Sequence, residues 1–232
     1  MTVRLDRDGS LACIVLDRPS RANAYDGAML DALEAALDQA LADPEVGALV
    51  IEAAGEGAFC GGADLVQMKQ AEPIDALDLR SQAVFDRLAR APLVSVAAVH
   101  GAAVAGGFEL ALACDLRVGS PLARFSLPET ALGLIPSAGG CTRLTRLAGP
   151  ARAKQVILGG MDLDARTALD WGLLMALTPE PRQEARAIAR RVAQRDRVAQ
   201  RLAKQVIDHA DTRTSLEAER VAEALLYARK RP

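Results

Sequence analysis

The sequence predicts an α/β fold in which short strands alternate with amphipathic helices and a group of further helices follows. Apolar runs at residues 11–16 and 93–99 are continuous, as expected for strands that are buried on both faces. Between these runs apolar residues recur at helical spacing, and Pro44 and Pro92 follow the ends of the helical segments. After Gly139, helical segments follow one another. This order implies a core whose ligand site lies outside the carboxyl ends of the strands.

The first half of the chain supplies most of the predicted core. Gly9 and Ser10 link two strand-like runs, the second of which covers residues 11–16. A helix is expected over 25–42, because Leu33 and Leu37 belong to one apolar face. The elements expected next are a strand over 46–51, a helix over 74–91, a strand over 93–99, a helix over 108–114 and strand pieces at 116–118 and 125–126.

The second half is predicted to be mainly helical. We therefore divide the chain into a core over 1–174 and a C-terminal helical region over 175–232, which would cover the site or form a subunit contact. The last helix carries Leu225, Leu226 and Tyr227 on an apolar face. The helices are expected over 141–147, 151–158, 164–171, 184–206 and 216–229.

Composition excludes several classes of function. A formal net charge of −2 and 3% aromatic residues argue against nucleic acid as a partner. The four cysteines form no Cys-x-x-Cys pair and there are two histidines, so neither a metal site nor a disulfide framework is expected. The N-terminus has no apolar signal segment. Together with the cysteine pattern, this leads us to expect a cytoplasmic protein. Glycines interrupt the apolar stretch at 93–114, so we expect no membrane partner.

Two glycine-containing turns are the strongest indication of a ligand site. Residues 100–109 read HGAAVAGGFE, and Gly106 and Gly107 open a predicted helix; residues 60–64 read CGGAD. Glycine lets backbone N–H groups approach a ligand closely, and a helix N-terminus adds partial positive charge. Two such turns can present two N–H groups to one oxygen, as in an oxyanion hole. Each turn taken singly is equally typical of a tight turn or a helix cap.

Two glutamates could carry acid–base chemistry beside these turns. Glu109 lies on the first turn of the helix that follows Gly106, and Glu129 follows Pro128 at a strand end. Two carboxyl groups that flank one water could add it across a polarised double bond. The alternative is that each glutamate is a buried structural acceptor or a solvated loop residue. Asp64 is expected to cap a helix that begins at Leu65.

Taken together, these segments resemble the enoyl-CoA hydratase/isomerase (crotonase) superfamily. The resemblance runs from about residue 11 to residue 174, in the order and spacing of the family. One block alone is weak, whereas the ordered series is specific. The matching blocks are RPSRANA at 18–24, AFCGGADL at 58–65, HGAAVAGGFE at 100–109, LACD at 112–115, PETALGLIP at 128–136, SAGGCTRL at 137–144 and ALDWGL at 168–173.

The resemblance implies a crotonase-like spiral of ββα units with a C-terminal helical cover, assembled as a homotrimer or a dimer of trimers. It places Gly61 and Gly106 where backbone N–H groups bind the thioester oxygen. It also implies that Glu109 activates water and that Glu129 exchanges the proton at the α-carbon. Ser137 stands where hydratases usually have glycine. The implied CoA groove contains Arg21, Ala22, Ala24, Ala63, Asp64 and Leu65, and the implied acyl pocket contains Phe108, Leu134, Pro136 and Ser137.

The resemblance leads us to expect a 2-enoyl-CoA hydratase. Such an enzyme adds water reversibly to an α,β-unsaturated acyl-CoA, and no separate cofactor is expected because CoA is part of the substrate. A Δ3–Δ2 enoyl-CoA isomerase is the first alternative, since it needs one base, which Glu129 could supply. A non-catalytic acyl-CoA-binding or assembly subunit is the second alternative. Loss of either glutamate would favour that subunit, and both Glu109 and Glu129 are present.

Overall fold

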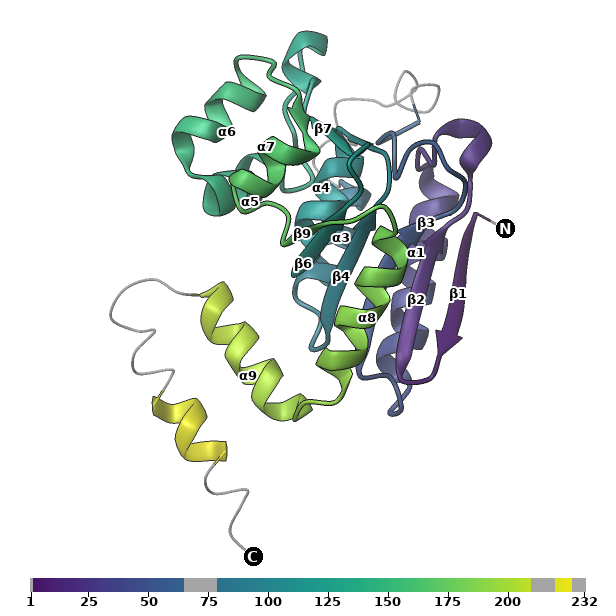
Figure 1. The fold of residues 1–232 in the computed structure, drawn as a ribbon, viewed down its shortest axis with the longest axis vertical. Coiled ribbons are helices and arrows are strands. Elements are labelled where there is room, and N and C mark those ends of the chain that lie inside the picture. Colours follow the sequence, from purple (N-terminus) through teal and green to yellow (C-terminus); the bar gives the residue numbers. More distant parts are fainter. Residues whose placement is uncertain (1, 65–78, 210–219, 227–232) are drawn as a thin grey trace, which may run out of the picture.

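The computed structural model describes residues 2–64, 79–209 and 220–226, and its main feature is a six-stranded sheet with helices on both faces (Figure 1). The strand order is β1 (Val3–Asp8), β2 (Leu11–Leu16), β3 (Ala48–Ala53), β4 (Val94–Val99), β6 (Leu116–Gly119) and β9 (Ala176–Leu177). A second sheet has the order β5 (Ala102–Val104), β7 (Arg124–Ser126) and β8 (Leu163–Asp164). β1 is antiparallel to β2, whereas the remaining neighbours in the large sheet are parallel. The predicted α/β class is confirmed. The helices, in chain order, are η1 (Pro19–Arg21), α1 (Gly27–Ala42), α3 (Arg80–Ala89), α4 (Gly106–Ala113), η3 (Glu129–Leu132), α5 (Gly140–Ala148), α6 (Pro150–Ile157), α7 (Ala165–Asp170), α8 (Pro181–Ala193) and α9 (Arg197–Asp208).

Different helices cover the two faces of the large sheet. On β2, Ala12 and Ile14 point into a core that includes buried residues of α1, α3 and α4, whereas Leu11 and Cys13 pack with buried residues of α8. Successive side chains of a strand point to opposite faces, so burial on both faces requires a continuous apolar run. α8 and β9 both lie beyond the predicted boundary at residue 174, and β9 pairs with β6.

Several predicted helices have different limits in the structure. The single helix expected over 184–206 is wrong: α8 ends at Ala193, and α9 begins at Arg197. The break occurs because the Asp196 side chain accepts the N–H of Ala199 at 2.8 Å, which starts a new helix. The helix expected over 74–91 corresponds to α3, and residues 74–78 lie outside the described residues. Of the helix expected over 216–229, the structure describes residues 220–226 only.

Asp115 joins three elements at the amino ends of β4 and β6. Its Oδ2 accepts hydrogen bonds from the N–H of Ser95 at 2.8 Å and from the Ser95 hydroxyl at 3.0 Å. The N–H of Asp115 in turn donates to Ser95 Oγ at 3.0 Å. Lys204 of α9 reaches the same Oδ2 at 2.8 Å and is itself buried. A buried ion pair of this kind is tolerated because further hydrogen bonds satisfy it.

The C-terminal helices extend away from the body of the molecule (Figure 1). On α9, Ile207 is 71% exposed, and in the helical segment 220–226 Val221 and Leu225 are 60% and 56% exposed. These apolar side chains are not covered within the described chain. Among residues 2–64, 79–209 and 220–226, none of the helices has the length and apolarity that crossing a bilayer would require.

Candidate active site

The entry into α4 is a tight backbone turn that requires small residues. Ala105 has φ 51° and ψ −126°, which is a strained conformation for a residue with a side chain. A Cβ on Gly107 would lie 2.0 Å from the carbonyl oxygen of Cys60, so only glycine fits there. Gly106 is the first residue of α4, and its N–H therefore has no partner within the helix. The turn presents this N–H at the amino end of a buried helix.

The second turn runs beside the loop that follows η1. Tyr25 pairs with Ala63 in a short parallel bridge: the N–H of Tyr25 donates to the Gly62 carbonyl, and the N–H of Asp64 donates to the Tyr25 carbonyl, both at 2.8 Å. The N–H of Gly61 donates to the Ala22 carbonyl at 2.9 Å. In this pairing the N–H of Ala63 points away from Tyr25.

The prediction that Gly61 supplies an oxyanion N–H is therefore wrong, because the Ala22 carbonyl already accepts that N–H. Among the described residues, no protein acceptor takes the N–H of Ala63 or that of Gly106. The two groups are neighbours, since a Cβ built on Gly62 would lie 3.2 Å from the nitrogen of Gly106. Ala63, which the sequence assigned to the CoA groove, thus replaces Gly61 as a candidate donor.

Glu109 is a buried carboxylate with one oxygen held by backbone. It is 3% exposed, and its Oε1 accepts the N–H groups of Ala138 and Gly140, both at 2.8 Å. The pKa of Glu109 is raised to about 7, mainly by burial and to a smaller extent by the charge of Glu129, while the N–H groups of Gly140 and Ala138 act to lower it. A Cβ on Gly140 would lie 2.9 Å from Oε1, so glycine is required for this close approach. Oε2 remains available for chemistry.

Glu129 is the second buried carboxylate, at the first residue of η3. It is 9% exposed, and among the described residues no hydrogen-bond partner reaches its Oε2. Burial raises the pKa of Glu129. The negative charge of Glu129 raises the pKa of Glu109, so the two predicted carboxylates are close enough to interact electrostatically. Perturbed carboxyl groups in pairs are typical of acid–base sites.

The buried charge of Glu109 predicts how stability depends on pH. The unfolded state loses the proton near pH 4.5, whereas the folded state keeps it up to about pH 7. The contribution of the protonated group to the free energy of unfolding is therefore fully present below pH 4.5 and is lost as the pH rises to about 7. We expect Glu109→Gln, relative to wild type, to gain on the order of 3 kcal/mol between pH 4.5 and pH 8. Urea unfolding at several pH values measures this difference, and parallel pH profiles for the two proteins would contradict it.

The residues predicted to form an acyl pocket have different environments. Phe108 is fully buried and packs on Phe125 with ring centroids 5.0 Å apart, so in this structure it lies within the core rather than at an open surface. Leu134 is 46% exposed, and Pro136 is buried. Ser137 is partly buried, and its carbonyl accepts from Gln82 Nε2 at 2.7 Å. The last three remain candidates because they lie in the segment between η3 and α5, the elements that carry Glu129 and Gly140.

Of the predicted CoA groove, the structure brings the loop 21–24 beside residues 61–64 through the Tyr25 bridge. Leu65, and with it the helix that Asp64 was expected to cap, lies outside the described residues. In the structure the Asp64 carboxylate pairs with Arg18 Nη1 at 3.1 Å, and the same Nη1 pairs with Asp26 at 3.1 Å. Arg21 is exposed and free to meet an anionic ligand.

Known proteins share this architecture over nearly the whole chain. Residues 6–230 match the family model described as "Enoyl-CoA hydratase/isomerase". The chain is 35% identical to a short-chain-enoyl-CoA hydratase of Clostridium acetobutylicum over 95% of this chain and 88% of that protein. It is 32% identical to a mitochondrial enoyl-CoA hydratase of Pongo abelii over 96% of this chain and 77% of that protein. A crystal structure of an enoyl-CoA hydratase from Bacillus anthracis superposes with a TM-score of 0.92, at 32% identity and covering 97% and 90% of the two chains.

Proposed function

The chain belongs to the enoyl-CoA hydratase/isomerase family, and we propose that it adds water reversibly to an α,β-unsaturated acyl-CoA thioester to give a 3-hydroxyacyl-CoA. The observation that carries this proposal is the pair of buried glutamates beside two backbone N–H groups without protein acceptors. The named relatives are hydratases, which agrees with this chemistry. Both carboxylates that hydration needs are present and buried.

In the proposed reaction, the N–H groups of Ala63 and Gly106 bind the thioester oxygen and stabilise the negative charge that develops on it. Glu109, held through Oε1, orients water at the β-carbon with Oε2 and takes one of its protons. Glu129 delivers a proton to the α-carbon. Its raised pKa favours the protonated form that can do so. The C–O and C–H bonds form while one proton leaves water and one leaves Glu129, so the two carboxyl groups exchange protonation states.

Incubating the protein with crotonyl-CoA and following the loss of the enoyl thioester absorbance tests the proposal. We expect turnover without any added cofactor. The isomerase alternative moves a proton between two carbons and needs Glu129 alone. It would be favoured if the protein converts 3-hexenoyl-CoA readily and leaves crotonyl-CoA unchanged. Binding of acyl-CoA without turnover of either substrate would favour the non-catalytic subunit.

We propose further that the protein assembles as a homotrimer or as a dimer of trimers. Support comes from the exposed apolar side chains Ile207, Val221 and Leu225 on its extended C-terminal helices; Tyr227 lies outside the described residues. Closed rings bury such surfaces. Light scattering at micromolar concentration is expected to give the mass of three or six chains. A monomer under these conditions would contradict the prediction.

A further inference from the structure

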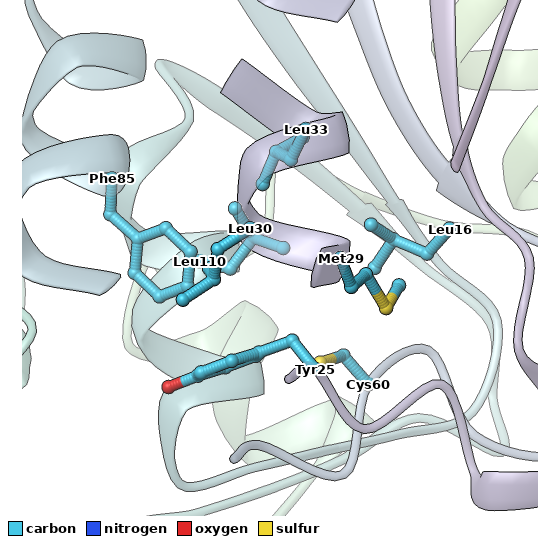
Figure 2. A pocket seen from close by; sticks show the side chains of 8 residues that line it. All are labelled: Leu16, Tyr25, Met29, Leu30, Leu33, Cys60, Phe85 and Leu110. Atoms are coloured by element: carbon cyan, nitrogen blue, oxygen red, sulfur yellow. The ribbon is translucent and has the colours of Figure 1, made fainter. Parts of the chain in front are cut away.

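A small apolar cavity lies directly behind the candidate site. Its volume is about 10 Å³, room for roughly one water molecule, and an apolar cavity of this size remains dry. Figure 2 shows its wall, which includes Met29, Leu30 and Leu33 of α1, Phe85 of α3, Leu110 of α4 and the ring of Tyr25. Leu16 of β2 and Cys60 complete the lining, and α4, which contributes Leu110, also carries Gly106 and Glu109 of the candidate site.

Tyr25 stands between this cavity and the candidate oxyanion donors. Its backbone holds the segment around Ala63, through the hydrogen bonds to Gly62 and Asp64. At the other end of the side chain, the hydroxyl lies against Gly106, where an added Cβ would be 2.0 Å from Oη. Tyr25 thus contacts the elements that carry both donors.

The phenol hydroxyl lies against the first turn of α4, which also carries Glu109. Gly106 and Glu109 are three residues apart on α4, so they lie on the same face of that helix. Burial is the main cause of the raised pKa of Tyr25, and Glu109 and Glu129 add smaller increases, which agrees with this proximity. Tyr25 is 9% exposed, so a small part of it remains accessible from outside the core. The ring also forms part of the cavity wall.

The ring is held firmly in this position. Phe85 contacts it edge to face, with centroids 5.6 Å apart and an interplanar angle of 87°. Gly106 limits movement on one side because the two groups are already in close contact. The Ser81 side chain of α3 acts on the hydroxyl from another side and lowers the pKa of Tyr25, against the larger effect of burial, which raises it. On the side of Gly106, an acyl chain would have to displace a ring that packing fixes to enter the cavity.

We propose that Tyr25 determines acyl-chain specificity by closing the acyl site against this cavity, which restricts the enzyme to short 2-enoyl chains. The inference rests on the proposed function, because it assumes that the thioester oxygen lies at Ala63 and Gly106. In this proposal, the atoms beyond the β-carbon lie against the phenol, because its hydroxyl lies against Gly106 on the turn of α4 that also carries Glu109. Removal of the ring would join the site to the cavity and give these carbons an apolar surface.

The test compares chain-length profiles of wild type, Tyr25→Ala, Tyr25→Leu and Leu33→Ala. Leu33 lines the same cavity from α1, so Leu33→Ala enlarges the cavity while Tyr25 still closes it. The readouts are kcat/KM for crotonyl-CoA and 2-octenoyl-CoA, and Kd for the saturated butanoyl- and octanoyl-CoA. Each buried methylene is worth roughly fourfold in affinity. We expect the octenoyl-to-crotonyl ratio to rise at least about tenfold in Tyr25→Ala, less in Tyr25→Leu, and not in Leu33→Ala.

An unchanged ratio in a folded Tyr25→Ala or Tyr25→Leu protein that still turns over crotonyl-CoA would overturn the inference, as would an equal shift in Leu33→Ala. Should Tyr25→Ala fail to fold, Tyr25→Leu decides the question alone. A wild type that hydrates neither substrate would defeat the proposed function. The ratio of Kd for octanoyl-CoA to Kd for butanoyl-CoA, compared between wild type and the Tyr25 variants, would then still support or overturn the role of Tyr25 in binding. A wild type that binds neither saturated acyl-CoA would defeat both proposals.

Discussion

Replacing either buried glutamate by glutamine is expected to slow the hydration of crotonyl-CoA by roughly 10²–10⁴-fold. Glutamine keeps the shape of the side chain but cannot exchange a proton at neutral pH. In Glu109→Gln the amide oxygen can still accept the N–H groups of Ala138 and Gly140, so the local structure should persist. Glu129→Gln should retain its place in η3 for the same steric reason. The rate is measured by the loss of enoyl thioester absorbance.

Glu45→Gln is a matched control, because Glu45 is an exposed glutamate between α1 and β3. It should keep wild-type turnover. Near wild-type turnover in a folded Glu109→Gln or Glu129→Gln protein would remove that residue from the mechanism. Glu109→Ala adds a further distinction: we expect it to abolish hydration of crotonyl-CoA while sparing any side activity on 3-enoyl-CoA, which needs only Glu129.

Gly106→Pro is expected to lower the rate by on the order of 10²–10³-fold, because it deletes one of the two N–H groups that we assign to the thioester oxygen. Proline is compatible with the first position of a helix, where the N–H has no intrahelical partner. The new ring carbons would, however, contact Tyr25, since a Cβ at this position lies 2.0 Å from Oη. Some loss of stability will therefore accompany the loss of the donor.

Gly106→Ala separates these two effects. It carries the same Cβ and meets the same contact with Tyr25, but it keeps the N–H. The rate of Gly106→Pro relative to Gly106→Ala therefore measures the donor itself, and circular dichroism shows whether each variant is folded. Equal rates in two folded variants would mean that the thioester oxygen is bound elsewhere.

The sequence is sufficient to predict those helices and strands whose limits are set by neighbouring residues along the chain. α1 was predicted from its apolar face, and its start follows from Asp26, whose side chain accepts the N–H of Met29 at 2.9 Å. The break between α8 and α9 is not evident from the sequence, because apolar and charged residues continue at helical spacing through it and the capping residue Asp196 lies within that pattern. Short strands such as β5 were missed because three small residues carry no periodic pattern.

For the site, sequence motifs locate both glutamates and both glycine turns but do not determine which N–H group is free. That depends on the bridge between Tyr25 and Ala63, which pairs segments far apart in the chain. The role of Tyr25 was missed for the same reason, since its contact with Gly106 is a tertiary one. The position of Phe108 beside Glu109 in the sequence likewise does not show that its ring packs on Phe125 in the core.

The reciprocal bonds between Ser95 and Asp115 have a consequence for the opposite end of the sheet. They form at the amino ends of β4 and β6, where Val96 lies beside Leu116 and, further along, Val99 beside Gly119. A slip of β6 by one residue would exchange its two faces and displace its carboxyl end by about 3.3 Å. Such a slip would break all three bonds, because the serine and the aspartate would no longer be opposite each other. The carboxylate of Asp115, at the amino ends of both strands, thus selects the alignment of β6 with β4. The turn that leads to Gly106 begins at the opposite, carboxyl end of β4.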